Sequence, residues 1–269
     1  MEFFKYNISI GLIFILCTLS PYAHADDSNC TTIYSPKLTG HGAAILPDNS
    51  KYEGEFQDGI FQGEGILVWK DGDRYVGSFK GGLFDGYGTL TQRDGGVFHG
   101  TYKEGRRNGK GKYVSANADL VYEGEYADDN VEGFGIWTQK SIGTYEGDFK
   151  KGRYNGKGKF LFEDGKRYEG EFRDGFYSGH GKLVRPGMDV YEGDFKNGDY
   201  SGFGHVEWPN GNWFEGTFQA GLANGEGRCR HGNSMGRCKY DQGALKNFVP
   251  APSAEVRLGD RFIFVSSLL

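Results

Sequence analysis

Glycine pairs in the pattern G-x-G recur along the chain, from Gly63-Glu64-Gly65 to Gly225-Glu226-Gly227. Glycine-rich loops can cradle phosphate groups through their backbone N–H donors. A nucleotide-binding loop of the P-loop kind also needs the pattern G-x-x-x-x-G-K-[ST], which this sequence does not contain. Every G-x-G instead falls at the same place in an internal repeat. We therefore interpret these glycines as structural.

Histidine and carboxylate side chains, the usual groups for acid–base catalysis and metal binding, are scattered along the sequence. His41 and His180 share one repeat position, but the units between them lack histidine there, and His99, His205 and His231 fall elsewhere. Neither H-E-x-x-H nor G-x-S-x-G occurs. The sequence thus predicts no catalytic residue, no bound metal ion and no cofactor.

The N-terminus has the pattern of a secretory signal peptide. Lys5 gives a positive start, an apolar stretch follows over residues 8–19, and Ala23-His24-Ala25 is an A-x-A cleavage signal. We expect residues 1–25 to be removed and the protein to be secreted or periplasmic. An uncleaved membrane anchor is the alternative, but the apolar stretch is short for a membrane span.

Three cysteines remain after residue 25, and an oxidising compartment favours their pairing. Cys229 and Cys238 flank a segment with the character of a hairpin loop, so we expect a disulfide between them. Cys30 would be a free thiol or an intermolecular partner. Zinc binding is disfavoured, because neither C-x-x-C nor H-x-x-x-H accompanies these cysteines.

A repeat of 23 residues organises most of the chain. Each unit opens on an aromatic residue, and each step is 23 residues except one of 24. A glycine follows two positions later, an aromatic residue four positions later, and the G-x-G later still. The opening residues are Tyr52, Tyr75, Phe98, Tyr122, Tyr145, Tyr168, Tyr191 and Phe214.

Each unit is predicted to form a β-hairpin. In Y-E-G-E-F the period of two places Tyr, Gly and Phe on one face of a strand and the acidic residues on the other. Turn residues such as Asp174-Gly175 and Asp164-Gly165 separate the strands. A lone hairpin is marginal in water, so the units must pair edge to edge. The glycines would leave a slot in which the aromatic rings lie flat across the sheet.

Composition agrees with this interpretation. The 269 residues include 46 Gly, 17 Tyr and 21 Phe, but the hydrophobic content of 37% is low for a protein with one thick core. The formal net charge of −5 gives no reason to expect nucleic-acid binding.

The pattern Y-E-G-E-F-x-D-G followed by G-x-G resembles the MORN (membrane occupation and recognition nexus) repeat. The resemblance covers about residues 52–227 in eight units in register, preceded by a half-unit at Gly40-His41-Gly42. It implies an all-β fold, an elongated, twisted antiparallel β-meander without catalysis of its own. Two departures from the family pattern occur: Asp129 replaces the usual turn glycine, and Val76-Gly77-Ser78 lacks the acidic pair. In addition, an aromatic ring recurs just before the G-x-G in several units, but the unit that starts at Phe98 has Arg107 there.

The resemblance implies a scaffold that binds protein partners or itself, for instance as an end-to-end dimer, through an aromatic groove and the sheet edges. The predicted groove residues are Tyr145, Phe149, Tyr154, Tyr168, Phe172, Tyr177, Tyr191, Phe195 and Tyr200.

The alternative is a peripheral membrane protein. Lys110, Lys112, Lys157 and Lys159 would present cations to anionic lipid headgroups on the face opposite the aromatic rings. The acidic residues of the first strands point to the same face, however, and would partly neutralise these lysines through cross-strand pairs.

The predicted organisation is therefore a signal peptide over residues 1–25, an N-terminal half-repeat cap over 26–51, the repeat array over 52–240, and a C-terminal linker and apolar tail over 241–269. Within the tail, the β-prone segment Arg261-Phe262-Ile263-Phe264-Val265 is expected to be buried against the edge of the last unit or in the aromatic groove.

Overall fold

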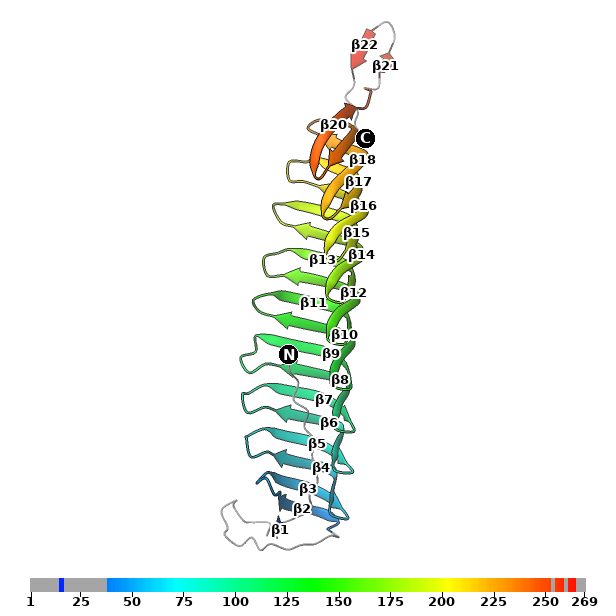
Figure 1. The fold of residues 1–269 in the computed structure, drawn as a ribbon. Coiled ribbons are helices and arrows are strands. Elements are labelled where there is room, and N and C mark those ends of the chain that lie inside the picture. Colours follow the sequence, from blue (N-terminus) through cyan, green and yellow to red (C-terminus); the bar gives the residue numbers. More distant parts are fainter. Residues whose placement is uncertain (1–14, 17–37, 253–254, 259–260, 265–269) are drawn as a thin grey trace. The chain divides into compact units, whose positions relative to one another are not determined.

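A computed structural model describes residues 15–16, 38–252, 255–258 and 261–264, and in these residues every regular element is a β-strand (Figure 1). The chain divides into two compact units, Met1–Arg153 and Tyr154–Leu269. No helix among the described residues is long and apolar enough to cross a membrane.

The first unit is a meander in which β2 to β11 pair with one another in chain order, always antiparallel. A short strand, β1 (Ile15–Leu16), pairs with the outer edge of β2 and lies within the predicted signal peptide. The strands are β2 (Gly40–Ile45), β3 (Lys51–Gln57), β4 (Ile60–Val68), β5 (Arg74–Lys80), β6 (Leu83–Thr91), β7 (Val97–Lys103), β8 (Arg106–Val114), β9 (Leu120–Ala127), β10 (Asn130–Gln139) and β11 (Gly143–Lys150).

The second unit repeats this arrangement from β12 to β20. Its strands are β12 (Arg153–Phe162), β13 (Arg167–Arg173), β14 (Phe176–Arg185), β15 (Asp189–Lys196), β16 (Asp199–Glu207), β17 (Trp213–Gln219), β18 (Leu222–His231), β19 (Ser234–Asp241) and β20 (Ala244–Pro250). The all-β antiparallel meander of hairpin repeats predicted from the sequence is confirmed.

The C-terminal region differs from the expectation in two respects. The meander continues through β20, beyond the boundary expected at residue 240. The apolar tail segment forms β22 (Arg261–Phe264), which pairs with β21 (Glu255–Leu258) and not with the edge of β20. A local hairpin satisfies the backbone groups of β22 without a long chain closure, which explains why it is preferred.

The two faces of each strand differ as the alternation predicts. In β3, Tyr52, Gly54 and Phe56 are buried, whereas Glu53 and Glu55 are exposed. We call the side that carries the aromatic rings the inner face and the opposite side the outer face.

A bulge at each G-x-G bends the second strand of the hairpin. Gly54 lies opposite Gly65 and Glu55 lies opposite Gln62, so Gly63 and Glu64 have no counterpart on β3. Gly63 has a φ of 59°, in the left-handed region that favours glycine. Bulges bend the strand that carries them and increase its twist, and Figure 1 shows the strands of each unit curved.

Glycines face one another across successive strands because the repeat keeps its register. In the first unit Gly54 pairs with Gly65 and Gly65 with Gly77, and in the second unit Gly170 pairs with Gly181. An aromatic ring lies over each such pair. A Cβ atom added at Gly65 would come within 2.5 Å of the Tyr52 hydroxyl, so the ring occupies the space that a side chain would need.

The core of each unit consists largely of stacked rings. Tyr52 stacks on Phe61 with centroids 3.7 Å apart, and Tyr191 stacks on Tyr200 at the same distance. Edge-to-face contacts link neighbouring repeats, such as Tyr191 with Phe218 at 5.0 Å. Such ring pairs are worth about 0.5–1.5 kcal/mol beyond their burial, which explains how a sheet with few aliphatic residues holds together.

Candidate binding surfaces

The aromatic residues predicted to line a binding groove are core residues in the structure. Tyr145 and Phe149 lie in the first unit, and the other seven lie in the second. Tyr145 and Tyr191 have no exposed surface, and Tyr200 is 7% exposed. Tyr168, Phe172, Phe195 and Phe149 are also buried, while Tyr154 and Tyr177 are partly buried.

The prediction that these rings form an accessible groove is therefore wrong. The bulges curve the sheet around its inner face, so the rings stack on one another and leave little surface for a partner. The alternation of residues along a strand shows which face the rings share, but it does not show this curvature.

The hydroxyl groups of two buried tyrosines donate to backbone carbonyls. The hydroxyl of Tyr168 donates to the backbone carbonyl of Glu171 at 2.8 Å, and that of Tyr191 donates to the carbonyl of Asp194 at 2.9 Å. Burial raises the pKa of Tyr168, Tyr191 and Tyr200, and it raises the pKa of Tyr177 to about 12. All of these hydroxyls are thus neutral near pH 7.

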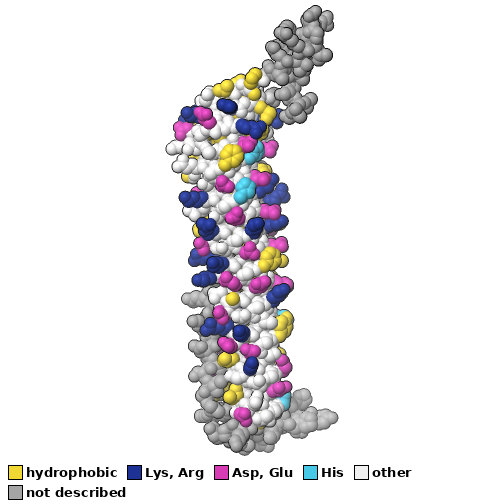
Figure 2. All heavy atoms as spheres, turned by 90° about the vertical axis from the view of Figure 1, so that its right-hand side faces the viewer, with side chains coloured by type: hydrophobic (Ala, Val, Ile, Leu, Met, Phe, Trp, Pro, Cys, Tyr) yellow, Lys and Arg dark blue, Asp and Glu magenta, His cyan; other side chains and the backbone are white. Residues whose placement is uncertain are grey.

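The outer face carries charged side chains in alternating signs. Lys112 forms an ion pair with Glu123 at 3.1 Å, and Lys159 forms one with Glu169 at 3.0 Å. Basic and acidic side chains are interspersed on the surface seen in Figure 2.

The other two lysines of the lipid-binding alternative follow the same rule of register. Lys110 lies opposite Glu125, and Lys157 lies opposite Glu171. The local neutralisation expected from the sequence therefore applies to this face, since each of the four lysines has a carboxylate residue as its cross-strand neighbour.

Three exposed aromatic side chains share one repeat position on the outer face, and sequence reasoning missed them. Tyr87, Phe134 and Phe203 occupy the middle position of the G-x-G and are 54%, 50% and 59% exposed. Comparison of that one position between repeats would have revealed them, because Glu64 and Glu226 occupy it in other units.

The two departures from the repeat at Arg107 and Asp129 contact each other. The Arg107 Nε lies 3.2 Å from Asp129 Oδ1, and the Asp129 backbone N–H donates to the Arg107 carbonyl at 3.0 Å. The guanidinium also lies 5.4 Å from the centre of the Phe98 ring and 5.3 Å from that of Tyr126. It therefore fills the space that a stacked ring occupies in other repeats.

The structure joins Cys229 and Cys238 in a disulfide, in agreement with the sequence-based expectation, with their Cα atoms 5.8 Å apart. The bond links β18 and β19 at the end of the second unit. Cys30 lies outside the described residues, as do the cleavage signal at Ala23-His24-Ala25 and Val265.

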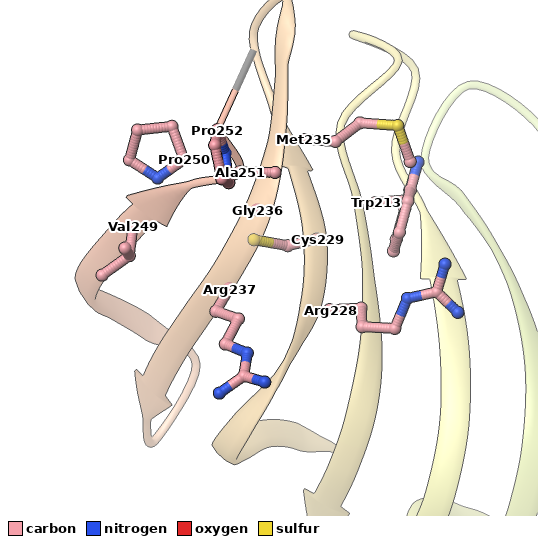
Figure 3. Close-up of a pocket in the computed structure, with 10 residues that line it drawn as sticks. All are labelled: Trp213, Arg228, Cys229, Met235, Gly236, Arg237, Val249, Pro250, Ala251 and Pro252. Atoms are coloured by element: carbon pink, nitrogen blue, oxygen red, sulfur yellow. The ribbon is translucent and has the colours of Figure 1, made fainter. Parts of the chain in front are cut away.

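A cavity of about 550 Å³ lies on the outer side of the same strands (Figure 3). Trp213, Met235, Val249 and Pro250 provide apolar walls, and Arg228 and Arg237 provide positive charge. Within the part of the chain that the structure describes, no cluster of three or more His, Cys, Asp or Glu side chains could hold a metal ion.

The model of the MORN repeat family matches seven stretches of the chain. These are residues 52–74, 75–97, 98–119, 145–167, 168–187, 191–213 and 214–236. The unit that begins at Tyr122 lies between two matches; it contains Asp129 and still folds as the β9–β10 hairpin. No curated protein matches the sequence.

Solved structures with similar strands are distant from this chain. The TCP10 domain of Danio rerio CPAP in complex with a peptide of Danio rerio STIL is 12% identical, with a TM-score of 0.45, and the alignment covers 80% of this chain and 97% of that one. The SAS-4 (dCPAP) TCP domain of Drosophila melanogaster in complex with a proline-rich motif of Ana2 is also 12% identical, with a TM-score of 0.26, and coverage is 65% and 82%.

Proposed function

This chain belongs to the MORN repeat family, and from that premise we propose that it is a non-catalytic scaffold that binds protein partners or a second copy of itself. The family and the all-β fold are typical of such scaffolds. The contacts would be made by the outer face and the sheet edges, because the inner rings are buried.

The observation that carries this proposal is the exposed aromatic position on the outer face. The fold accepts Glu64 or Glu226 at the middle of the G-x-G, so it does not need an aromatic ring there. Phe203 nevertheless exposes 59% of its surface at this position. The packing of the repeat does not require this aromatic side chain, and its exposure to water is unfavourable. Exposed aromatic side chains of this kind are typical of surfaces that contact another protein.

The sheet edges offer a second means of association. Among the described strands, β20 pairs with β19 alone, so its other edge presents unpaired backbone donors and acceptors. At the other end of the chain, β1 covers the edge of β2 and lies in the residues predicted to be removed. Cleavage after Ala25 would open that edge, and open edges can pair with another chain.

We place this activity in the periplasm or outside the cell. The support is the signal-peptide pattern together with the Cys229–Cys238 disulfide, which an oxidising compartment maintains.

Site-specific photo-crosslinking in the cells that produce the protein tests the proposal. A photoreactive phenylalanine analogue would replace Phe203 and, as a matched control, Glu64, which occupies the same repeat position in the first unit. We expect the probe at residue 203 to form a covalent adduct with a protein, either a partner or a second copy, identified by mass spectrometry. Adducts with lipid alone would favour the membrane alternative, and the absence of protein adducts from both positions would contradict the proposal.

A further inference from the structure

One position of the repeat on the outer face of the second unit carries a basic residue in successive hairpins. Lys159 lies opposite Glu169, Lys182 opposite Glu192, and His205 opposite Glu215, so each of these three has an acidic neighbour on the following strand. The next residue of this series is Arg228. Its neighbour on the following strand is another arginine, Arg237.

This arginine pair is unfavourable for the isolated protein. Like charges directly opposite one another destabilise a sheet. Arg228 has one carboxylate nearby, with its Nη1 3.7 Å from Glu215 Oε2. Arg237 is exposed, and among the described residues it forms no ion pair. The positive charge at this position is thus not neutralised as it is in the preceding repeats.

The apolar cavity lies directly beside this charge. Trp213 and Met235 form one wall, and Val249 and Pro250 form the other. Met235 is 43% exposed and Val249 is 54% exposed. In Figure 3 both arginines line the cavity from neighbouring strands; the Arg237 side chain points along its own strand, and the Arg228 side chain points toward the strand of Trp213. The arrangement combines a site for an anion with an adjoining site for an apolar group.

We propose that this cavity binds a peptide segment of a protein partner in which an Asp or Glu stands beside a large apolar side chain. The carboxylate is held between Arg228 and Arg237, and the apolar side chain enters the cavity next to Trp213. The proposal rests on the protein-binding function argued above and identifies one site and one ligand chemistry for it.

A peptide fits this surface better than a membrane does. Glu215 and Glu226 flank the arginines on the same face, and the preceding repeats alternate in charge. A flat layer of anionic headgroups would also approach these carboxylates and be repelled by them. A single acidic side chain of a peptide can approach the arginines without approaching the carboxylates. The open edge of β20 lies next to the cavity and can add main-chain hydrogen bonds to an extended peptide.

The test selects peptides from a random displayed library on the purified protein, expressed from its whole sequence. We expect enrichment of segments with an acidic residue next to a large apolar one. An enriched peptide is then synthesised, and its affinity is measured by fluorescence polarisation for the unaltered protein and for Arg237→Glu. Arg167→Glu, an exposed arginine on β13 of the same unit, is the matched control.

Arg237→Glu should weaken binding about tenfold or more and at the same time raise the melting temperature, because it converts an Arg–Arg neighbour pair into an Arg–Glu pair. A peptide with its acidic residue changed to Lys should bind the Arg237→Glu protein better than the original peptide does. Trp213→Ala should weaken the peptide as well, through the loss of the apolar wall. Arg167→Glu, the control, should change the affinity of neither the original peptide nor the peptide that carries Lys.

Three results would overturn the proposal. Selected peptides without acidic residues, or peptides whose affinity is unchanged by Arg237→Glu and Trp213→Ala, would exclude this site but leave the protein-binding function intact. A library that yields no binding peptide would contradict the site, and if the crosslinking probe at residue 203 also forms no protein adduct, the function fails with it.

Discussion

Two kinds of glycine serve different purposes in each repeat. Gly179 begins a G-x-G and has a φ of 57°, so its backbone conformation is the reason for glycine. Gly170 lies in the centre of a first strand, where the structure leaves no space for a side chain. A Cβ atom at this residue would lie 2.6 Å from both the Gly181 Cα and the Tyr168 hydroxyl.

We therefore expect Gly170→Val to destabilise the protein by about 1–3 kcal/mol, since the branched side chain must displace the Tyr168 ring or part the two strands. Urea unfolding followed by circular dichroism measures this. Gly187→Asn is a suitable control, because nothing lies within 4 Å of its Cβ position and its φ of 72° is one that Asn accepts. Equal loss in both variants would show that ring-over-glycine packing is not the cause.

The tyrosines make the stability of the protein sensitive to alkali. Burial raises the pKa of Tyr177 from 10.0 to about 12. The folded state therefore holds the proton of the Tyr177 hydroxyl more tightly than the unfolded state does. The contribution of this group to the free energy of unfolding is complete below pH 10 and is lost as the pH rises toward about 12. The free energy of unfolding should fall across this range, together with an increase in tyrosinate absorbance. Tyr177→Phe should show a smaller fall; an identical fall would assign the effect to other groups.

At the scale of the hairpin, two departures from the repeat compensate for one another. Arg107 on β8 and Asp129 in the turn between β9 and β10 belong to successive units, and each fits because the other is present. The Arg107 side chain is 13% exposed, so loss of its partner leaves a largely buried charge.

Arg107→Ala and Asp129→Gly should each destabilise the first unit, and a double-mutant cycle should show a coupling of about 1 kcal/mol. The double variant Arg107→Phe, Asp129→Gly restores the residues that other repeats carry, and it should recover most of the stability. Unfolding in urea is measured for the unaltered protein, the two single variants, the double variant of the cycle and the restored double variant. Strictly additive effects would mean that the two residues do not act as a pair.

Features that lie within one strand or on either side of one turn could be predicted from the sequence, whereas features that depend on how neighbouring strands are aligned could not. The spacing of Tyr168, Gly170 and Phe172 was enough to assign a strand and its buried face, and the positions of Cys229 and Cys238 were enough to expect their pairing. The curvature that buries the rings depends on two extra residues per bulge, which the alternation within a strand does not reveal. The Arg107–Asp129 ion pair and the cross-strand placement of Arg228 opposite Arg237 each join neighbouring hairpins, and they emerge only when adjacent units are aligned strand by strand.

At the scale of the whole molecule, charge is balanced locally more than it is separated between faces. The formal net charge is −5, and lysines such as Lys112 and Lys159 are held in ion pairs with residues of the same face. Exposed pairs of this kind contribute little to stability, but they reduce the positive potential available to a membrane.

We accordingly expect no retention of the protein on vesicles with about one-third phosphatidylserine at roughly 0.1 M salt. Co-sedimentation compared with uncharged vesicles measures this. Retention that disappears at high salt, and also disappears when Lys110, Lys112, Lys157 and Lys159 are changed to Glu, would establish the lipid-binding alternative.

The glycine-to-glycine register has a consequence for the gene that encodes this chain. In the second unit the central glycine of a first strand faces a glycine on the strand before it and another on the strand after it, as Gly193 faces Gly181 and Gly204. A duplication or deletion of one whole repeat in the coding sequence therefore joins strands that already match, and the rings still meet a glycine beneath them. The number of hairpins can change over evolutionary time without any substitution elsewhere, whereas an insertion of a single codon within a strand would turn its rings toward the solvent.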